Sequence, residues 1–95
     1  MAYYLSKDAE TDIRNIFIEG AQTFGIQQAE RYHDQLAEIF QFLSDNPRVA
    51  YERPELSPPV RIHPFQSHIV VYAIDGNEDV FIVRVRHGHE NWVDD

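Results

Sequence analysis

The stretch from Ser6 to Pro47, SKDAETDIRNIFIEGAQTFGIQQAERYHDQLAEIFQFLSDNP, decides the fold because it carries two amphipathic helical patterns with almost nothing between them. Apolar residues recur at steps of three and four from Ala9 to Phe24, and again from Ala29 to Leu43, which is typical of helices with one buried face. Ser6 is suited to cap the first helix and Gly25 to end it, while the DNP sequence stops the second. The short link at residues 24–27 predicts an antiparallel helical hairpin.

Strand patterns lie on both sides of this hairpin. AYYLS at 2–6 precedes it, and VRIHPF at 60–65, SHIVVYAI at 67–74 and VFIVRVR at 80–86 follow a proline-rich loop. The unbroken apolar centre of SHIVVYAI is typical of a strand covered on both faces. One helical hairpin can cover one face of an antiparallel sheet. We therefore predict an α+β two-layer sandwich with an N-terminal strand, the helical hairpin and a three-stranded antiparallel meander, in the order β-α-α-β-β-β.

Length and composition limit the function classes. Ninety-five residues make one domain, residues 1–95, and the absence of cysteine excludes disulfides and thiolate catalysis. Sixteen acids against eight Lys and Arg give a net charge of −8, so we expect no direct binding to nucleic acid. With no basic and apolar leader and no run of about 18–20 apolar residues, we expect a cytoplasmic protein that does not contact membranes.

The C-terminal stretch RVRHGHENW, residues 84–92, gathers positive and aromatic side chains in an otherwise acidic chain. Arg84 and Arg86 are two residues apart in a predicted strand and so should share one face. Either these arginines pair with surface acids while Trp92 caps the core, or the stretch contacts a partner. The residues of that predicted contact surface are Arg84, Arg86, His87, His89, Asn91 and Trp92.

Two chemical alternatives exist for this stretch. Metal-independent RNA cleavage needs a base, a cation and an acid. The residues that could supply them are Arg61, Arg84, Arg86, His87, His89 and Glu90. The HGHE sequence also offers metal ligands, but the helical histidine pair of common zinc sites is missing. Without phosphate-loop, G-x-S-x-G or H-E-x-x-H signatures, we expect no catalytic residues, no metal and no cofactor.

The apolar stripes of the two helices are wider than contact with a sheet requires. Four residues at or near the stripe margins are responsible: Phe17, Ile18, Ile39 and Phe42. They either complete the core between the helices or line an exposed groove that a partner helix fills. His33 lies on the same stripe, where we expect it to be structural.

Taken together, four segments make the chain resemble the ParE branch of the RelE/ParE toxin superfamily, from bacterial type II toxin–antitoxin pairs. YYLSKDAETDIRNI is similar to the family's opening strand and helix, and FGIQQAERYHDQLAEIFQFLSDNP to its second helix. RPEL, VRIHPFQSHIVVYAI and VFIVRVRHGHENW are similar to its loop and later strands. The order and spacing of these segments cover about ninety residues.

This resemblance implies the same two-layer fold and a neutralising ParD-like antitoxin, bound along the hairpin in a hetero-oligomer. It also implies inhibition of DNA gyrase by protein–protein contact rather than by catalysis. RelE-type relatives instead cleave messenger RNA on the ribosome and carry several basic residues plus a C-terminal Tyr or His. Here the last tyrosine is Tyr72 and the single lysine is Lys7, which favours the ParE branch. A ribosome-dependent endoribonuclease and a weakly toxic antitoxin-binding module are the alternatives.

Overall fold

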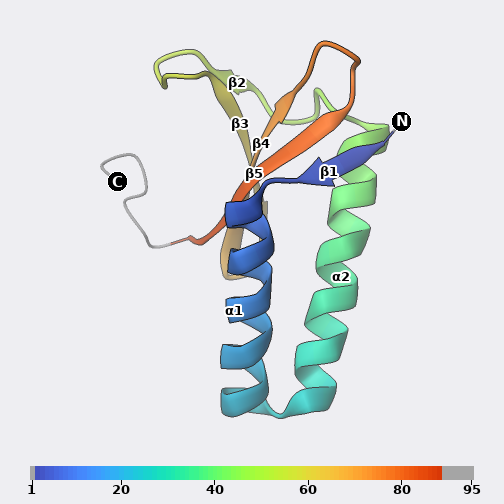
Figure 1. Ribbon diagram of the computed structural model, residues 1–95, viewed down its shortest axis with the longest axis vertical. Coiled ribbons are helices and arrows are strands. Elements are labelled where there is room, and N and C mark those ends of the chain that lie inside the picture. Colours follow the sequence, from blue (N-terminus) through green and yellow to red (C-terminus); the bar gives the residue numbers. More distant parts are fainter. Residues whose placement is uncertain (1, 89–95) are drawn as a thin grey trace.

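The computed structural model of the chain describes residues 2–88 and confirms the predicted α+β order (Figure 1). Its elements are β1 (Tyr3–Leu5), α1 (Lys7–Phe24), α2 (Ile26–Asp45), β2 (Glu52–Arg53), β3 (Val60–Phe65), β4 (His68–Ile74) and β5 (Val80–His87). The sequence missed only β2, which lies inside the predicted loop. A strand of two residues is too short to show an alternating pattern.

The sheet has the strand order β1-β5-β4-β3-β2. β3, β4 and β5 form the predicted antiparallel meander, and β2 extends it at one edge. β1 pairs parallel to β5, with Tyr3 opposite Val80 and Leu5 opposite Ile82, so the sheet is mixed rather than wholly antiparallel. Because β1 reaches only the first residues of β5, the N-terminus of α1 lies beside the remaining edge of β5.

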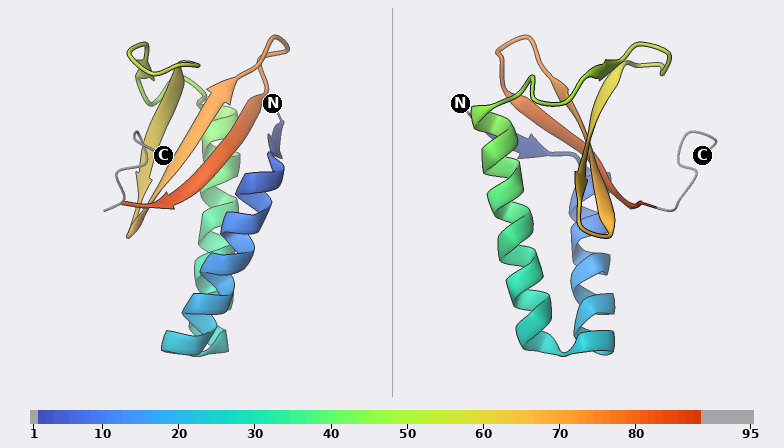
Figure 2. Two further views of the ribbon diagram at one scale, coloured as in Figure 1. Left: turned by 60° about the vertical axis from the view of Figure 1, so that its left-hand side comes forward. Right: turned by 180° about the vertical axis from the view of Figure 1, so that it is seen from behind.

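The two helices form a hairpin that covers one face of the sheet and extends beyond its lower end (Figure 2). Ser6 caps α1 as predicted, since its Oγ accepts the backbone N–H of Ala9 at 2.9 Å. Gly25 alone joins the helices, a shorter link than predicted, and its φ of 93° is one that favours glycine. Its N–H donates to the carbonyl of Ala21 at 3.1 Å, which ends α1.

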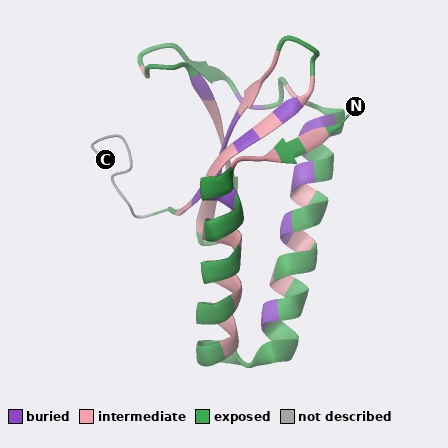
Figure 3. Cartoon of the chain, viewed as in Figure 1, coloured by how far each residue is buried: buried purple, intermediate pink, exposed green. Residues whose placement is uncertain are grey.

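The core lies between the sheet and the inner sides of the helices, and the outer sides of the helices are exposed (Figure 3). Leu36 and Leu43 of α2 are almost fully buried and belong to the same core cluster as Val70 and Tyr72 of β4. Burial raises the pKa of Tyr72, whose hydroxyl donates to the carbonyl of Pro47 at 2.8 Å. Residues on both sides of β4 are buried at its centre, as predicted. Val70 faces the helices. Because side chains alternate along a strand, Val71 faces the opposite side of the sheet, which neither helix covers in residues 2–88.

Candidate functional site

The edge of β5 is held to the start of α1 at a β-bulge. The β4–β5 register shifts so that Val83 is an extra residue in the ladder. Ser6 stabilises this point twice: its N–H donates to the carbonyl of Ile82 at 3.0 Å, and its hydroxyl donates to the carbonyl of Val83 at 2.6 Å. The residue that caps α1 therefore also completes the hydrogen bonding of the bulge.

Asp12 holds the next part of β5. Nε and Nη2 of Arg84 donate to its two carboxylate oxygens at 2.7 and 3.0 Å, and the backbone N–H of Val85 donates to Oδ2 at 3.0 Å. The side chains of Arg84 and Asp12 are 35% and 14% exposed. A bidentate, partly buried ion pair of this kind fixes the relative orientation of the two side chains as well as pairing their charges. Of the two interpretations of Arg84 from sequence, pairing with an acid therefore describes its surroundings.

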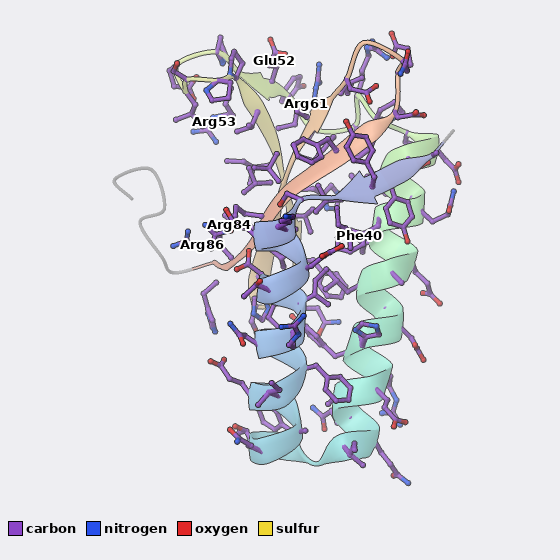
Figure 4. All side chains as sticks on the ribbon, in the orientation of Figure 1. Phe40, Glu52, Arg53, Arg61, Arg84 and Arg86 are labelled. Atoms are coloured by element: carbon purple, nitrogen blue, oxygen red, sulfur yellow. The ribbon has the colours of Figure 1, made fainter. Side chains whose placement is uncertain are left out.

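Arg84 and Arg86 share a face of the sheet, as their spacing predicts. Arg84 is opposite Val71 and Arg86 is opposite Ile69, both on the side turned away from the helices. Both arginines are partly exposed and lie close together beside the start of α1 (Figure 4). Together with the apolar partners on β4, they give this face a basic end.

Arg61, by contrast, lies apart from the other residues of the predicted ribonuclease set. It is opposite Tyr72, on the face that carries the core, and its guanidinium donates to the carbonyl of Ala50 at 2.6 Å. Figure 4 shows it at the other end of the sheet, near Glu52 and Arg53. The fold therefore does not place Arg61 beside Arg84 and Arg86.

His87, the last residue of β5, points to the helix side and forms a cluster that the sequence did not predict. It is directly opposite His68, with 4.7 Å between ring centroids. Nδ1 of His68 lies 2.6 Å from the hydroxyl oxygen of Tyr32 on α2. Burial raises the pKa of Tyr32, and a hydrogen bond from the backbone of Ser67 partly offsets this, so Tyr32 is a neutral phenol near neutral pH. In the sequence, the one signal for this cluster was His68, a histidine at the start of an apolar strand and on its core-facing side.

A groove of about 390 Å³ lies between the two helices and the β3–β4 turn. Its apolar walls are formed by residues of both helices: Ile13, Ile16, Phe17, Phe24, Ala29 and Leu36. Of the four residues predicted to bind an antitoxin, Phe17 lines this groove and Ile39 packs against the core. Ile18 and Phe42 lie outside the groove and are 45% and 40% exposed.

His89, Glu90, Asn91 and Trp92 lie outside the described residues. Within residues 2–88, no group of three or more His, Asp or Glu side chains is placed to hold a metal ion. Over the same range, neither helix is long and apolar enough to cross a membrane. His33 is exposed on α2, with its ring edge toward Phe17 at 6.0 Å between centroids.

The helical hairpin on one face of a mixed sheet is the fold that the resemblance to the RelE/ParE toxin superfamily implies. Within it, the chain belongs to the family described as ParE toxin of type II toxin-antitoxin system, parDE, whose family model matches residues 3–92. Toxin ParE1 of Mycobacterium tuberculosis is 29% identical over 85 residues, covering 90% of this chain and 87% of the relative. Toxin ParE3 of Caulobacter vibrioides is 29% identical over 80 residues, covering 84% and 79%.

A solved structure has the same fold. It is described as the chromosomal ParDE TA system from P. aeruginosa and superposes with a TM-score of 0.78. The match covers 92% of this chain and 95% of that chain at 18% sequence identity. The overall fold is therefore shared although most side chains differ.

Proposed function

We propose that this chain stops bacterial growth by binding DNA gyrase in the cytoplasm, through protein–protein contact and without catalysis. A ParD-like antitoxin neutralises it in a hetero-oligomer. The observation that carries this proposal is that the chain has two surfaces of different chemistry, on opposite sides of the sheet. The basic face with Arg84 and Arg86 lies on the helix-free side of the sheet, and the apolar groove lies between the helices. One surface suits the target and the other suits the antitoxin.

On the target side, Arg86 is the residue most suited to direct contact. Arginine is enriched among the residues that dominate binding at protein interfaces, and the neighbouring Ile69 adds apolar area. The net charge of −8 disfavours a ribosomal RNA surface. The position of Arg61 on the other face also supports contact rather than RNA cleavage. The next residues along the chain that we propose for the target contact are His89, Asn91 and Trp92, whereas His87 points to the helix side.

On the antitoxin side, the groove suits an amphipathic helix, whose apolar side chains recur every three to four residues. Phe17 and Phe24 provide apolar surface along α1, and Phe24 is largely exposed at the free end of the hairpin. The exposed Ile18 and Phe42 extend the apolar surface outside the groove. An antitoxin that wraps around the hairpin would cover these positions together.

The test is expression of the chain alone in bacteria, with the DNA-damage response and transcript integrity measured in the same culture. We expect a damage response with intact transcripts, and inhibition of DNA supercoiling by gyrase with the purified toxin. Arg86→Glu should abolish both effects and still bind the antitoxin. Arg31→Glu, at an exposed position on α2, is the charge-matched control and should kill as wild type does.

The alternatives predict different results. Cleaved transcripts without DNA damage would overturn gyrase inhibition in favour of a ribosome-dependent endoribonuclease. Harmless expression, with the antitoxin still bound, would indicate a weakly toxic binding module. For the groove, Phe24→Glu should kill as wild type does but escape neutralisation by the antitoxin, and full rescue of this variant would contradict the proposed docking side.

A further inference from the structure

The apolar groove ends in a polar site at the sheet. His68 and His87 close the groove at that end and also line an adjoining hollow of about 270 Å³ that reaches Arg86 and Asn15. The surface therefore changes along its length, from the aromatic and aliphatic walls near Phe24 to cationic or protonatable groups at the sheet. A segment that fills the groove meets both kinds of chemistry.

The contact between Tyr32 and His68 is compatible with both protonation states of the imidazole. Burial keeps Tyr32 neutral, and its oxygen already accepts a hydrogen bond from the backbone of Ser67. Its hydroxyl hydrogen is then available to Nδ1 of His68, 2.6 Å away, which leaves the proton of a neutral His68 on Nε2. When His68 is protonated, Nδ1 becomes a donor and the Tyr32 oxygen accepts. Tyr32 thus has a hydrogen bond to offer to either form.

The charged groups around this pair come from α1 and β5. Asp12 already accepts three hydrogen bonds, from Arg84 and from the backbone of Val85. Arg86 adds a positive charge from β5, and the exposed Glu19 adds a negative one from the rim of α1. Tyr32 of α2 is neutral. A proton on one imidazole therefore adds a positive charge at this end of the groove.

We propose that His68 and His87 bind a carboxylate of the antitoxin segment that fills the groove, and that one imidazole takes up a proton on binding. This inference rests on the proposed function, which places the antitoxin in the groove. The segment lies with apolar side chains against α1 and α2 and with an aspartate or glutamate at the sheet end. A second copy of this chain is a poorer occupant, because two chains of net charge −8 repel each other.

The sign of the pH dependence follows from linkage. A carboxylate beside the pair favours the protonated imidazole, so the complex holds more protons than the free toxin. Binding then tightens as pH falls through the range of about pH 8 to 6 in which histidine ordinarily changes charge. Because two adjacent imidazolium ions repel, less than one further proton is taken up. The expected gain in affinity is about three- to tenfold.

The experiment measures binding of the purified full-length toxin to the full-length antitoxin encoded beside it, by calorimetry at pH 8, 7 and 6. Buffers of different ionisation enthalpy report proton uptake directly. We expect tighter binding and net uptake at low pH for wild type, and neither effect for His68→Gln/His87→Gln. His33→Gln, which changes an exposed histidine in the same groove, is the matched control and should keep the pH dependence.

The outcomes separate the two proposals. If Phe24→Glu weakens binding but wild type shows no pH dependence and no proton uptake, the carboxylate site is overturned and the groove remains the docking site. If Phe24→Glu binds as wild type does, the groove is not the docking site. A pH dependence that persists in His68→Gln/His87→Gln also overturns the inference, as does self-association of the toxin through the groove in sedimentation. The single variant His87→Gln changes an exposed side chain and leaves the contact between Tyr32 and His68 in place.

Discussion

Replacing Asp12 by asparagine tests whether the N-terminus of α1 holds the end of β5. The substitution keeps the size of the side chain but removes its charge and one of its two acceptor oxygens. Asp12 accepts two hydrogen bonds from Arg84 and one from the backbone of Val85, and its side chain is 14% exposed. In the variant, one of these donors loses its partner, and the Arg84 charge is no longer compensated.

The expected loss of stability lies between two limits. Breaking a fully buried ion pair from one side costs about 3–5 kcal/mol, and an exposed pair is worth about 0.2–1 kcal/mol. Because Arg84 is 35% exposed, water can solvate part of its charge. We therefore expect Asp12→Asn to lower the free energy of unfolding by about 2–3 kcal/mol. For a domain of this size that corresponds to about 10–20 °C in Tm.

Urea denaturation followed by circular dichroism measures this difference, with an unchanged m-value as the sign that the unfolding transition is the same. Glu78→Gln is the matched control, since it makes the same carboxylate-to-amide change in the Arg48–Glu78 pair, where both side chains are more than half exposed. It should cost less than about 1 kcal/mol. Equal losses for the two variants would refute a structural role for Asp12 beyond that of an ordinary surface acid.

Four further substitutions test other parts of the fold. Ser6→Ala removes a helix cap and the hydroxyl donor to the bulge together, so it should cost about 1–2 kcal/mol in thermal denaturation, and a negligible cost would contradict the double role. Gly20→Ala should raise stability by up to about 1 kcal/mol, because its new methyl meets only an ordinary contact at 3.6 Å, whereas Gly25→Ala should lower stability because of the positive φ. Backbone N–H groups, chiefly that of Asp79, lower the pKa of Asp75. The Asp75 carboxylate therefore stabilises the fold above about pH 4, and this stabilisation is lost as pH falls through the folded-state pKa. When the free energy of unfolding is measured at decreasing pH, it should therefore fall less in Asp75→Asn than in wild type.

The hairpin and the meander could be predicted because the apolar residues in each recur with a period that can be read from residues close in sequence. The apolar steps through α1 and α2 specify one buried face for each helix, and the cap at Ser6 depends on residues close in sequence. The parallel pairing of β1 with β5 could not be read in this way. It joins Tyr3 to Val80, residues far apart in the chain, and a three-residue strand contains no information about its neighbour.

The site was less predictable because it depends on register. Arg84 and Arg86 share a face by simple alternation, but the partner of Arg84 is on a helix more than seventy residues earlier. The bulge at Val83 also shifts alternation along β5, so that His87 turns inward toward His68. No local pattern gives the position of a bulge. The pairing of His68 with His87 therefore follows from the strand register and not from any local sequence pattern.

The contrast between the two arginines decides how loss-of-toxicity variants should be interpreted. Arg84 is bound to Asp12 next to the bulge, so changing it disturbs the end of β5 and, through Asp12, the start of α1. Ile13 and Ile16 follow Asp12 on that helix and line the groove. A variant at Arg84 can thus lose target binding and antitoxin binding through one structural change. Arg86 lies two residues further along the strand and past that ion pair, so loss of toxicity with normal stability and normal antitoxin binding at Arg86 identifies a contact with the target.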